Sequence, residues 1–209
     1  MSILKNFVVF EGGDGSGTTT QMKKLKEKFS AESGLPALFG TYEPTDGPVG
    51  RLIRQGLKGK IPFKNETVAC LFAADRNDHI YGPLGIAERC GRGELVVCDR
   101  YVLSSLVYQG ITCGEELPEI LNRQFPMPEL TIFFDIDPET AQKRIENRRQ
   151  KEIYEAADFQ VKVCERYRTL LPRFKTAGSK TVIIDACKPV DEVAGEVWRA
   201  IKKLPIFKG

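Results

Sequence analysis

Residues 7–20 read FVVFEGGDGSGTTT and decide the fold. A short run of strand-forming apolar residues precedes four glycines within six positions, and a helical pattern begins directly afterwards. Glycines let consecutive backbone N–H groups turn inward around an anion, and the N-terminus of the following helix adds partial positive charge. This order of strand, glycine-rich loop and helix predicts a phosphate-binding loop at the edge of a parallel sheet.

One position of this loop departs from the usual pattern G-x-x-x-x-G-K-[ST]. The pattern here begins at Gly12 and ends with Gly17, Thr18 and Thr19. Thr19 falls where a hydroxyl usually meets Mg²⁺, whereas Thr18 replaces the lysine that contacts the β- and γ-phosphates. Because a glycine-rich turn after a strand is often only a tight connection, this segment alone leaves both interpretations open.

The rest of the chain alternates apolar runs with helical patterns. The runs that predict buried strands cover residues 7–10, 37–39, 95–98, 130–136 and 181–184. The helical patterns cover residues 19–29, 49–57, 67–90, 138–146, 154–176 and 190–203. This alternation is typical of an α/β fold, so we expect about five parallel strands flanked by helices. At 209 residues, the chain is expected to form a single domain over 1–209.

Composition disfavours several other classes of protein. A net charge of +3 does not suggest a nucleic-acid partner or a membrane-surface helix. No apolar run approaches the roughly 20 residues that cross a bilayer, and the N-terminus lacks the organisation of a signal peptide. The six cysteines are scattered singly without a C-x-x-C pair, so we expect reduced thiols in a cytoplasmic protein. The single histidine, His79, argues against a multi-histidine metal site or a Ser-His-Asp triad.

A second group of polar residues follows the apolar run at 95–98. It comprises Asp99-Arg100-Tyr101, Ser104-Ser105 and Tyr108-Gln109-Gly110. Ligands of open parallel sheets bind beyond the carboxyl ends of the strands, where an aspartate can hold hydrated Mg²⁺ and an arginine can clamp a phosphate. A lone Asp-Arg pair is usually a surface ion pair, but the whole pattern is far more specific.

These motifs resemble those of the thymidylate kinases, and the resemblance covers nearly the whole chain. The loop matches the family pattern E-G-x-D-G-x-G-K-T at Glu11, Gly12, Asp14, Gly15, Gly17 and Thr19. Further segments that match are Glu43-Pro44, Ile53-Arg54, residues 71–76, Asp99-Arg100-Tyr101, residues 108–110 and Asp185-Ala186. Besides Thr18, one departure is the segment 45–47, which reads Thr-Asp-Gly where the family usually has Gly-Gly-Thr.

The resemblance implies the three-layer P-loop kinase fold with a mobile lid at about 143–155. It implies phosphoryl transfer from ATP to thymidine monophosphate (dTMP) with Mg²⁺, small-molecule nucleotides as partners, and a homodimer. The implied ATP-binding residues are Gly12, Gly13, Asp14, Gly15, Ser16, Gly17, Thr18, Thr19 and Ala186. The implied dTMP-binding residues are Asp14, Glu43, Arg54, Phe72, Arg76, Arg100, Ser105, Tyr108 and Gln109. The implied metal-binding residues are Thr19 and Asp99.

Each acceptor-site residue has an implied role. Phe72 would stack on thymine, and Arg76 would donate to a carbonyl of the base. Ser105 and Gln109 would address the base edge, while Tyr108 would crowd the 2′ position of the sugar. Arg54 and Arg100 would hold the monophosphate, with Asp14 and Glu43 between the two nucleotides. Taken singly, Phe72 on an apolar helix is more often a core residue, Glu43 could be an exposed turn residue, and Arg54 and Arg76 could be solvated helix residues.

The family places a catalytic basic residue either in the loop or in the lid. Residues 13–16 contain no arginine or lysine, so this chain resembles the lid-arginine subgroup. The implied catalytic residues are Asp14, Arg100, Arg148 and Arg149, with Lys151 close by in the sequence. The commoner lid sequence Asp-Arg-x-Glu is absent, so the catalytic lid residue stays open. A solvated helix end is the alternative interpretation of the basic stretch at 143–151.

Three hypotheses compete: an active thymidylate kinase, a nucleotide-binding module without turnover, and a kinase for another nucleoside monophosphate. Asp14, Asp99, Arg100 and the lid arginines argue against a module that only binds. Tyr108 and Phe72 argue against a ribonucleotide acceptor. The positive charge missing at Thr18 must come from the lid, from another basic residue such as Lys23, from the cation, or from nowhere.

Overall fold

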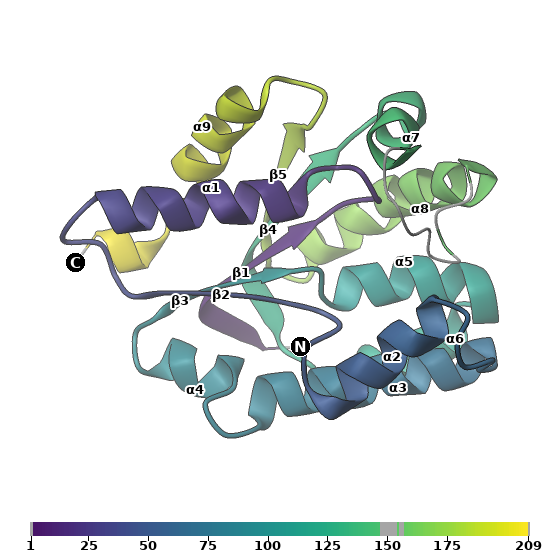
Figure 1. The fold of residues 1–209 in the computed structure, drawn as a ribbon. Coiled ribbons are helices and arrows are strands. Elements are labelled where there is room, and N and C mark those ends of the chain that lie inside the picture. The colour runs from purple at the N-terminus through teal and green to yellow at the C-terminus, as the bar shows by residue number, and fades with distance from the viewer. Residues whose placement is uncertain (1, 147–153, 155–156, 209) are drawn as a thin grey trace.

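The computed structural model describes residues 2–146, 154 and 157–208. Its centre is a parallel sheet in the order β2-β3-β1-β4-β5 (Figure 1). The strands are β1 (Ile3–Glu11), β2 (Leu38–Tyr42), β3 (Leu95–Asp99), β4 (Met127–Asp135) and β5 (Lys180–Asp185). The predicted α/β class with about five parallel strands is confirmed.

Helices cover both faces of the sheet and make a three-layer arrangement (Figure 1). On one face lie α1 (Thr18–Ala31), α7 (Pro138–Glu146) and α9 (Val190–Ile201). On the other face lie α2 (Pro48–Leu57), α3 (Asn65–Tyr81), α4 (Ile86–Gly91), α5 (Val102–Cys113), α6 (Glu116–Asn122) and α8 (Ala157–Thr176). A short 3-10 helix, Pro205–Phe207, follows α9.

The central strand β1 has apolar side chains on both faces because helices cover both. Phe7 and Val9 belong to the core beneath α5, and Phe7 meets Tyr101 edge-on at 5.1 Å between ring centroids. Val8 and Phe10 belong to the core beneath α1, on the opposite face. This two-sided burial explains why the strand reads as a continuous apolar run rather than an alternating pattern.

The predicted helix over residues 67–90 is wrong in one respect, because the chain breaks inside it. Helix α3 ends at Tyr81 and α4 begins at Ile86. The sequence between them contains Pro83, which has no N–H to donate, and Leu84 adopts a left-handed φ of 56°. The break lets α4 turn back toward the start of β3.

The sequence interpretation missed α5 and α6. Residues 102–113 carry Val102, Leu103, Leu106 and Val107 at helical spacing, a signal that was available. Polar residues between them, such as Ser104, Ser105 and Gln109, interrupt the apolar pattern of the segment. The sequence interpretation predicts a binding role for Ser105 and Gln109 but no helix that contains them. The structure places both residues on α5.

The carboxyl ends of β1 and β3 create a crevice at the edge of the sheet. The two strands are neighbours, with Phe10 in register with Asp99. The chain leaves β1 toward α1 on one face and leaves β3 toward α5 on the other. Strand ends whose connections diverge in this way form the usual ligand site of an open parallel sheet.

Within the described ranges, no helix combines the length and apolarity that a bilayer crossing demands. All six cysteines are free thiols, as predicted, and three of them are buried. Burial raises the pKa of the Cys90 thiol to about 12 and also raises that of Cys98. These two thiols are therefore protonated and shielded at neutral pH.

We expect thiol labelling of the native protein at pH 8 to spare Cys90 and to modify the exposed Cys70. With a pKa of about 12, only about one Cys90 side chain in 10,000 is thiolate at that pH. Peptide mass spectrometry after brief iodoacetamide treatment would measure the difference, and urea-unfolded protein is the control in which both react. Equal labelling in the native state would contradict the burial of Cys90.

Candidate active site

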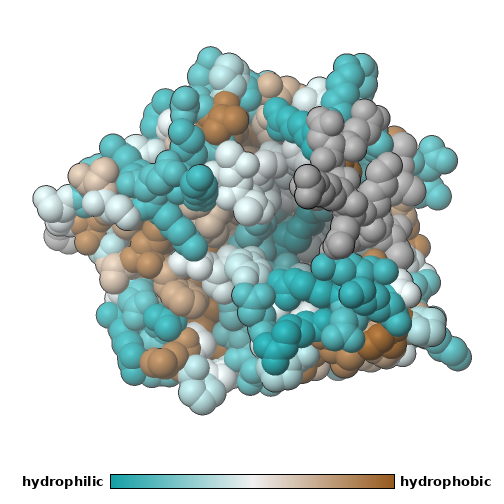
Figure 2. All heavy atoms as spheres, in the orientation of Figure 1, coloured by the Kyte–Doolittle hydropathy of each residue, from teal (hydrophilic) through white to brown (hydrophobic). Residues whose placement is uncertain are grey.

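A cavity of about 680 Å³ opens at the carboxyl edge of the sheet, around the glycine-rich loop. Figure 2 shows that this face of the molecule is hollowed near its centre. The lining residues are Gly13, Asp14, Gly15, Ser16, Gly17, Thr18, Thr19, Thr20, Gln21, Tyr42, Glu43, Asp99, Arg100, Arg144, Ala186, Lys188, Val190 and Val193. We call this space the loop cavity.

The loop conformation depends on two glycines in the left-handed region. Gly15 has φ +83° and Gly17 has φ +88°. A Cβ atom on Gly15 would also lie 2.7 Å from the carbonyl oxygen of Ala141, so a larger residue does not fit. Helix α1 begins directly after Gly17 without a side-chain cap, so its positive end is available at the loop cavity.

Most of the residues predicted to bind ATP line the loop cavity. They are Gly13, Asp14, Gly15, Ser16, Gly17, Thr18, Thr19 and Ala186. Gly12 does not line it and instead packs beneath the loop, where a Cβ atom would lie 2.5 Å from the hydroxyl of Ser16. Gly12 therefore shapes the loop rather than facing the cavity.

Thr19 and Asp99 meet inside the loop cavity. The Thr19 hydroxyl donates to Asp99 Oδ2 at 2.8 Å. Asp99 Oδ1 is buried and has no hydrogen-bond partner among the described residues. A buried carboxylate oxygen without a partner is costly, and a hard cation such as Mg²⁺ prefers such oxygen ligands. The two residues therefore fit a magnesium site.

A second, smaller cavity of about 110 Å³ lies between α3 and α5. We call it the helix cavity; its lining residues are Asp14, Glu43, Pro44, Leu57, Phe72, Arg76, Arg100, Tyr101, Ser104, Ser105, Tyr108, Gln109 and Tyr154. All five residues predicted to contact a base or sugar lie here, namely Phe72, Arg76, Ser105, Tyr108 and Gln109. Gln109 Oε1 is buried and has no partner among the described residues.

Asp14, Glu43 and Arg100 line both cavities and so form the junction between them. Arg100 Nη2 donates to Asp14 Oδ1 at 2.6 Å, and Arg100 Nη1 donates to the Tyr108 hydroxyl at 3.1 Å. The Arg100 guanidinium also lies over the Tyr108 ring. Burial raises the pKa of Tyr108, although Arg100 opposes the shift, so the phenol stays neutral.

Gln160 on α8 supports this junction and was missed by the sequence interpretation. Its Nε2 donates to Asp14 Oδ2 and to the Tyr154 carbonyl oxygen, both at 2.7 Å. Its Oε1 accepts from the Asp14 N–H at 3.1 Å. Asp14 and Gln160 are 146 residues apart in the chain, and no local pattern signals their contact.

Glu43 takes part in a buried ion pair. Arg76 donates to Glu43 Oε2 through Nε at 2.9 Å and through Nη2 at 2.6 Å, and both side chains are almost fully buried. Arg76 also donates to Asn122 Oδ1, and to the Ser105 hydroxyl at 3.0 Å. Most N–H groups of Arg76 are thus already used, which limits its predicted donation to a base to the remaining Nη1 hydrogen.

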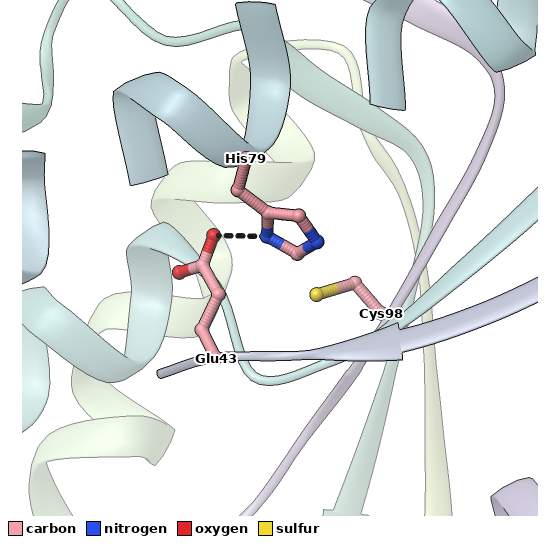
Figure 3. A group of neighbouring side chains, drawn as sticks. All are labelled: Glu43, His79 and Cys98. Atoms are coloured by element: carbon pink, nitrogen blue, oxygen red, sulfur yellow. Dashed lines mark hydrogen bonds and ion pairs between the residues drawn. The ribbon is translucent and has the colours of Figure 1, made fainter. Parts of the chain in front are cut away.

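Figure 3 shows Glu43, His79 and Cys98, whose potential ligand atoms lie within 4.8 Å of one another. Each atom already has a protein partner. His79 bridges Glu43 Oε1 at 3.2 Å and the Thr41 hydroxyl at 2.8 Å, and the Cys98 thiol donates to the Arg100 carbonyl oxygen at 3.1 Å. The adjacent Arg76 charge would oppose a cation, so we interpret this group as support for Glu43.

Arg54 lines neither cavity, and its contact with the acceptor phosphate stays a prediction. Its guanidinium donates to the carbonyl oxygens of Pro44 and Thr45 and lies 3.6 Å from Asp46. Arg54 thus holds the turn after Glu43. The unusual Thr45 also has a structural reason, because its N–H and hydroxyl both donate to buried Asp75, at 2.7 and 2.6 Å.

Two basic residues at the loop cavity could supply the positive charge that the missing loop lysine would have provided. Arg148, Arg149 and Lys151 lie outside the described residues, as does most of the predicted lid. Lys23 is 81% exposed, lies beside Glu27 and lines neither cavity. Arg144 and Lys188 do line the loop cavity, and Arg144 Nη1 donates to the Gly15 carbonyl oxygen at 3.3 Å.

The parallel sheet, the glycine-rich loop on the α1 N-terminus and the Thr19–Asp99 pair define the class of P-loop kinases. Comparison with known proteins narrows the class. The family model described as thymidylate kinase matches residues 10–197. The chain belongs to the thymidylate kinase family.

Two relatives from distant organisms match almost end to end. One, from Treponema pallidum, is 41% identical over 206 residues, covering 97% of this chain and 98% of the relative. Another, from Methanocaldococcus jannaschii, is 39% identical over 201 residues, covering 95% of this chain and 97% of the relative. Both carry the provisional name of thymidylate kinase.

We expect Glu43→Ala to lower the free energy of unfolding by about 3–5 kcal/mol, because the change leaves the buried Arg76 charge without its partner. Urea denaturation followed by circular dichroism would measure the loss. The matched control is Asp191→Asn, which breaks the exposed pair with Lys24 and should leave the midpoint unchanged. A Glu43 variant as stable as the control would contradict the assignment of a buried ion pair.

Proposed function

We propose that this protein transfers the γ-phosphoryl group of ATP to dTMP, producing ADP and thymidine diphosphate. The observation that carries the proposal is the junction of the two cavities, where Asp14, Glu43 and Arg100 face both spaces. A donor in the loop cavity and an acceptor in the helix cavity would meet at these residues. Family membership and the names of the relatives support the same reaction.

The walls of the helix cavity suit a nucleoside monophosphate as the acceptor. Phe72 offers an aromatic face on which a base can stack. Gln109 Oε1 needs a donor, and the N3–H group of thymine supplies one. Tyr108 would crowd a 2′-hydroxyl and so favour deoxyribose. Arg100 would hold the acceptor phosphate together with Arg54, whose guanidinium also holds the turn after Glu43.

On the donor side, the backbone N–H groups of residues 13–19 would bind the ATP phosphates, with the base toward Ala186. Phosphoryl transfer requires alignment and positive charge around the migrating group rather than covalent help from the protein. The acceptor phosphate is already an anion, so no strong general base is needed. Arg100 would supply positive charge from the acceptor side, and Arg144 with lid residues Arg148 and Arg149 from the donor side.

Thr19 and Asp99 would hold Mg²⁺ through the Thr19 hydroxyl and the partnerless Asp99 oxygen. The cation would neutralise charge on the β- and γ-phosphates when bound. A homodimer, a cytoplasmic location and a single domain over 1–209 remain predictions from the family resemblance and the composition.

Mg²⁺-ATP with dTMP should yield ADP at a rate well above that with any ribonucleoside monophosphate. Tyr108 and the small helix cavity favour a deoxyribose and a single-ring base. A coupled ADP-release assay with thymidine, uridine and guanosine monophosphates would measure this. Absence of turnover at saturating ATP would indicate a module that only binds, and faster turnover with another acceptor would reassign the substrate.

Thr18→Lys should lower the KM for ATP by about tenfold, because a charge-assisted hydrogen bond replaces a neutral one. Steady-state kinetics at saturating dTMP would measure the shift. Lys23→Ala is the control: its exposed side chain lies outside both cavities, so the KM for ATP should not change. A higher KM for the Thr18 variant would show that Thr18 belongs to a different phosphate-binding arrangement.

A further inference from the structure

Glu11 is a buried carboxylate with no role in the proposed chemistry. It is the last residue of β1, directly before the glycine-rich loop, and is 1% exposed. It lines neither the loop cavity nor the helix cavity. Burial raises the pKa of its carboxyl, whereas hydrogen bonds from Ser104 and the charge of Arg100 oppose the shift. Burying a carboxyl group costs free energy unless hydrogen bonds compensate for the lost water, so the partners of Glu11 explain its position.

One oxygen of Glu11 caps α5. The N-cap residue of this helix, Tyr101, makes no side-chain cap hydrogen bond of its own. Glu11 Oε1 instead accepts from the Tyr101 N–H at 3.0 Å and from the Ser104 N–H at 3.3 Å. Two N–H groups that the helix leaves unpaired are thereby satisfied at the N-terminal end of α5.

The other oxygen of Glu11 connects to Arg100. Glu11 Oε2 accepts from the Ser104 hydroxyl at 2.6 Å and from the Tyr167 hydroxyl at 3.1 Å. The Tyr167 hydroxyl in turn accepts from Arg100 Nη1 at 3.5 Å. Glu11 therefore reaches the Arg100 side chain through a single hydroxyl group.

The backbone of Arg100 needs such support. Its φ of +70° lies in the left-handed region, which is unfavourable for a residue with a large side chain. Its N–H donates to the Phe10 carbonyl oxygen at 2.8 Å, and the next N–H, of Tyr101, donates to Glu11. The N–H groups of Arg100 and Tyr101 thus donate to Phe10 and Glu11, which are consecutive residues of β1.

We propose that Glu11 is a positioning residue for the phosphoryl acceptor: by capping α5 and bonding Tyr167, it holds Arg100 and the base-facing residues of α5 in their working geometry. The inference rests on the proposed function. It links the donor loop, which begins at Gly12, to the acceptor helix through one carboxylate. A misplacement of reacting groups by about 1 Å can cost about 100-fold in rate, so such a support matters.

Glu11→Gln and Tyr167→Phe test the proposal. Each should lower kcat/KM for dTMP by about 10- to 100-fold and raise the KM for dTMP, with the KM for ATP within about twofold of wild type. Tyr167→Phe removes a single hydroxyl, so it still tests the proposal if the Glu11→Gln variant does not fold. The matched control is Ser179→Ala, which removes an equally buried hydroxyl, bonded to Thr131 at 3.1 Å, far from both cavities.

Kinetics should be paired with amide hydrogen exchange. In Glu11→Gln, exchange at Tyr101 and Ser104 should speed up, whereas amides in the middle of α5 should keep wild-type protection. If Glu11→Gln and Tyr167→Phe lose stability but keep wild-type kinetics for dTMP, as expected of the Ser179→Ala control, the proposal is overturned. A wild-type protein that does not turn over dTMP would instead contradict the proposed function, which separates the two failures.

Discussion

The register of β1 against β3 is the constraint on which the site depends. Pairing Phe10 with Asp99 brings the two strand ends side by side, and the Arg100 N–H then donates to the Phe10 carbonyl oxygen. Since the chain departs from these ends toward opposite faces, a crevice opens between the glycine-rich loop and α5. A slip of one residue would turn the side chains of a strand to the other face and separate Thr19 from Asp99.

Several charged side chains lie at the crevice, and each is paired with an opposite charge or with hydrogen-bond donors. Glu43 is paired with Arg76, Asp14 with Arg100, and Glu11 with the hydroxyls and N–H groups at the start of α5. Each pair joins elements far apart in the sequence, so the same contacts that stabilise the fold also position the proposed site. Two buried side-chain oxygens without a partner among the described residues, Asp99 Oδ1 and Gln109 Oε1, belong to residues that line the loop cavity and the helix cavity respectively.

Several sequence predictions are confirmed and several are wrong, each for a physical reason. The parallel sheet was predictable because two-sided burial leaves continuous apolar runs, and the loop because its glycines leave a local pattern. The helix over 67–90 was predicted without its break at Pro83, and α5 was missed because its polar residues obscured the helical spacing. The phosphate contact of Arg54 stays a prediction, and the structure shows its guanidinium donating to the carbonyl oxygens of Pro44 and Thr45.

The sequence by itself determined the fold class, the loop conformation and the family, because these depend on local patterns of apolar residues, glycines and short motifs. Only the tertiary structure decided which polar groups share a partner. The contacts of Gln160 with Asp14 and of Glu11 with Ser104 and Tyr167 join residues separated by 93 to 156 positions. Hydrogen bonds between such distant residues depend on packing and register, which leave no signal in either segment alone.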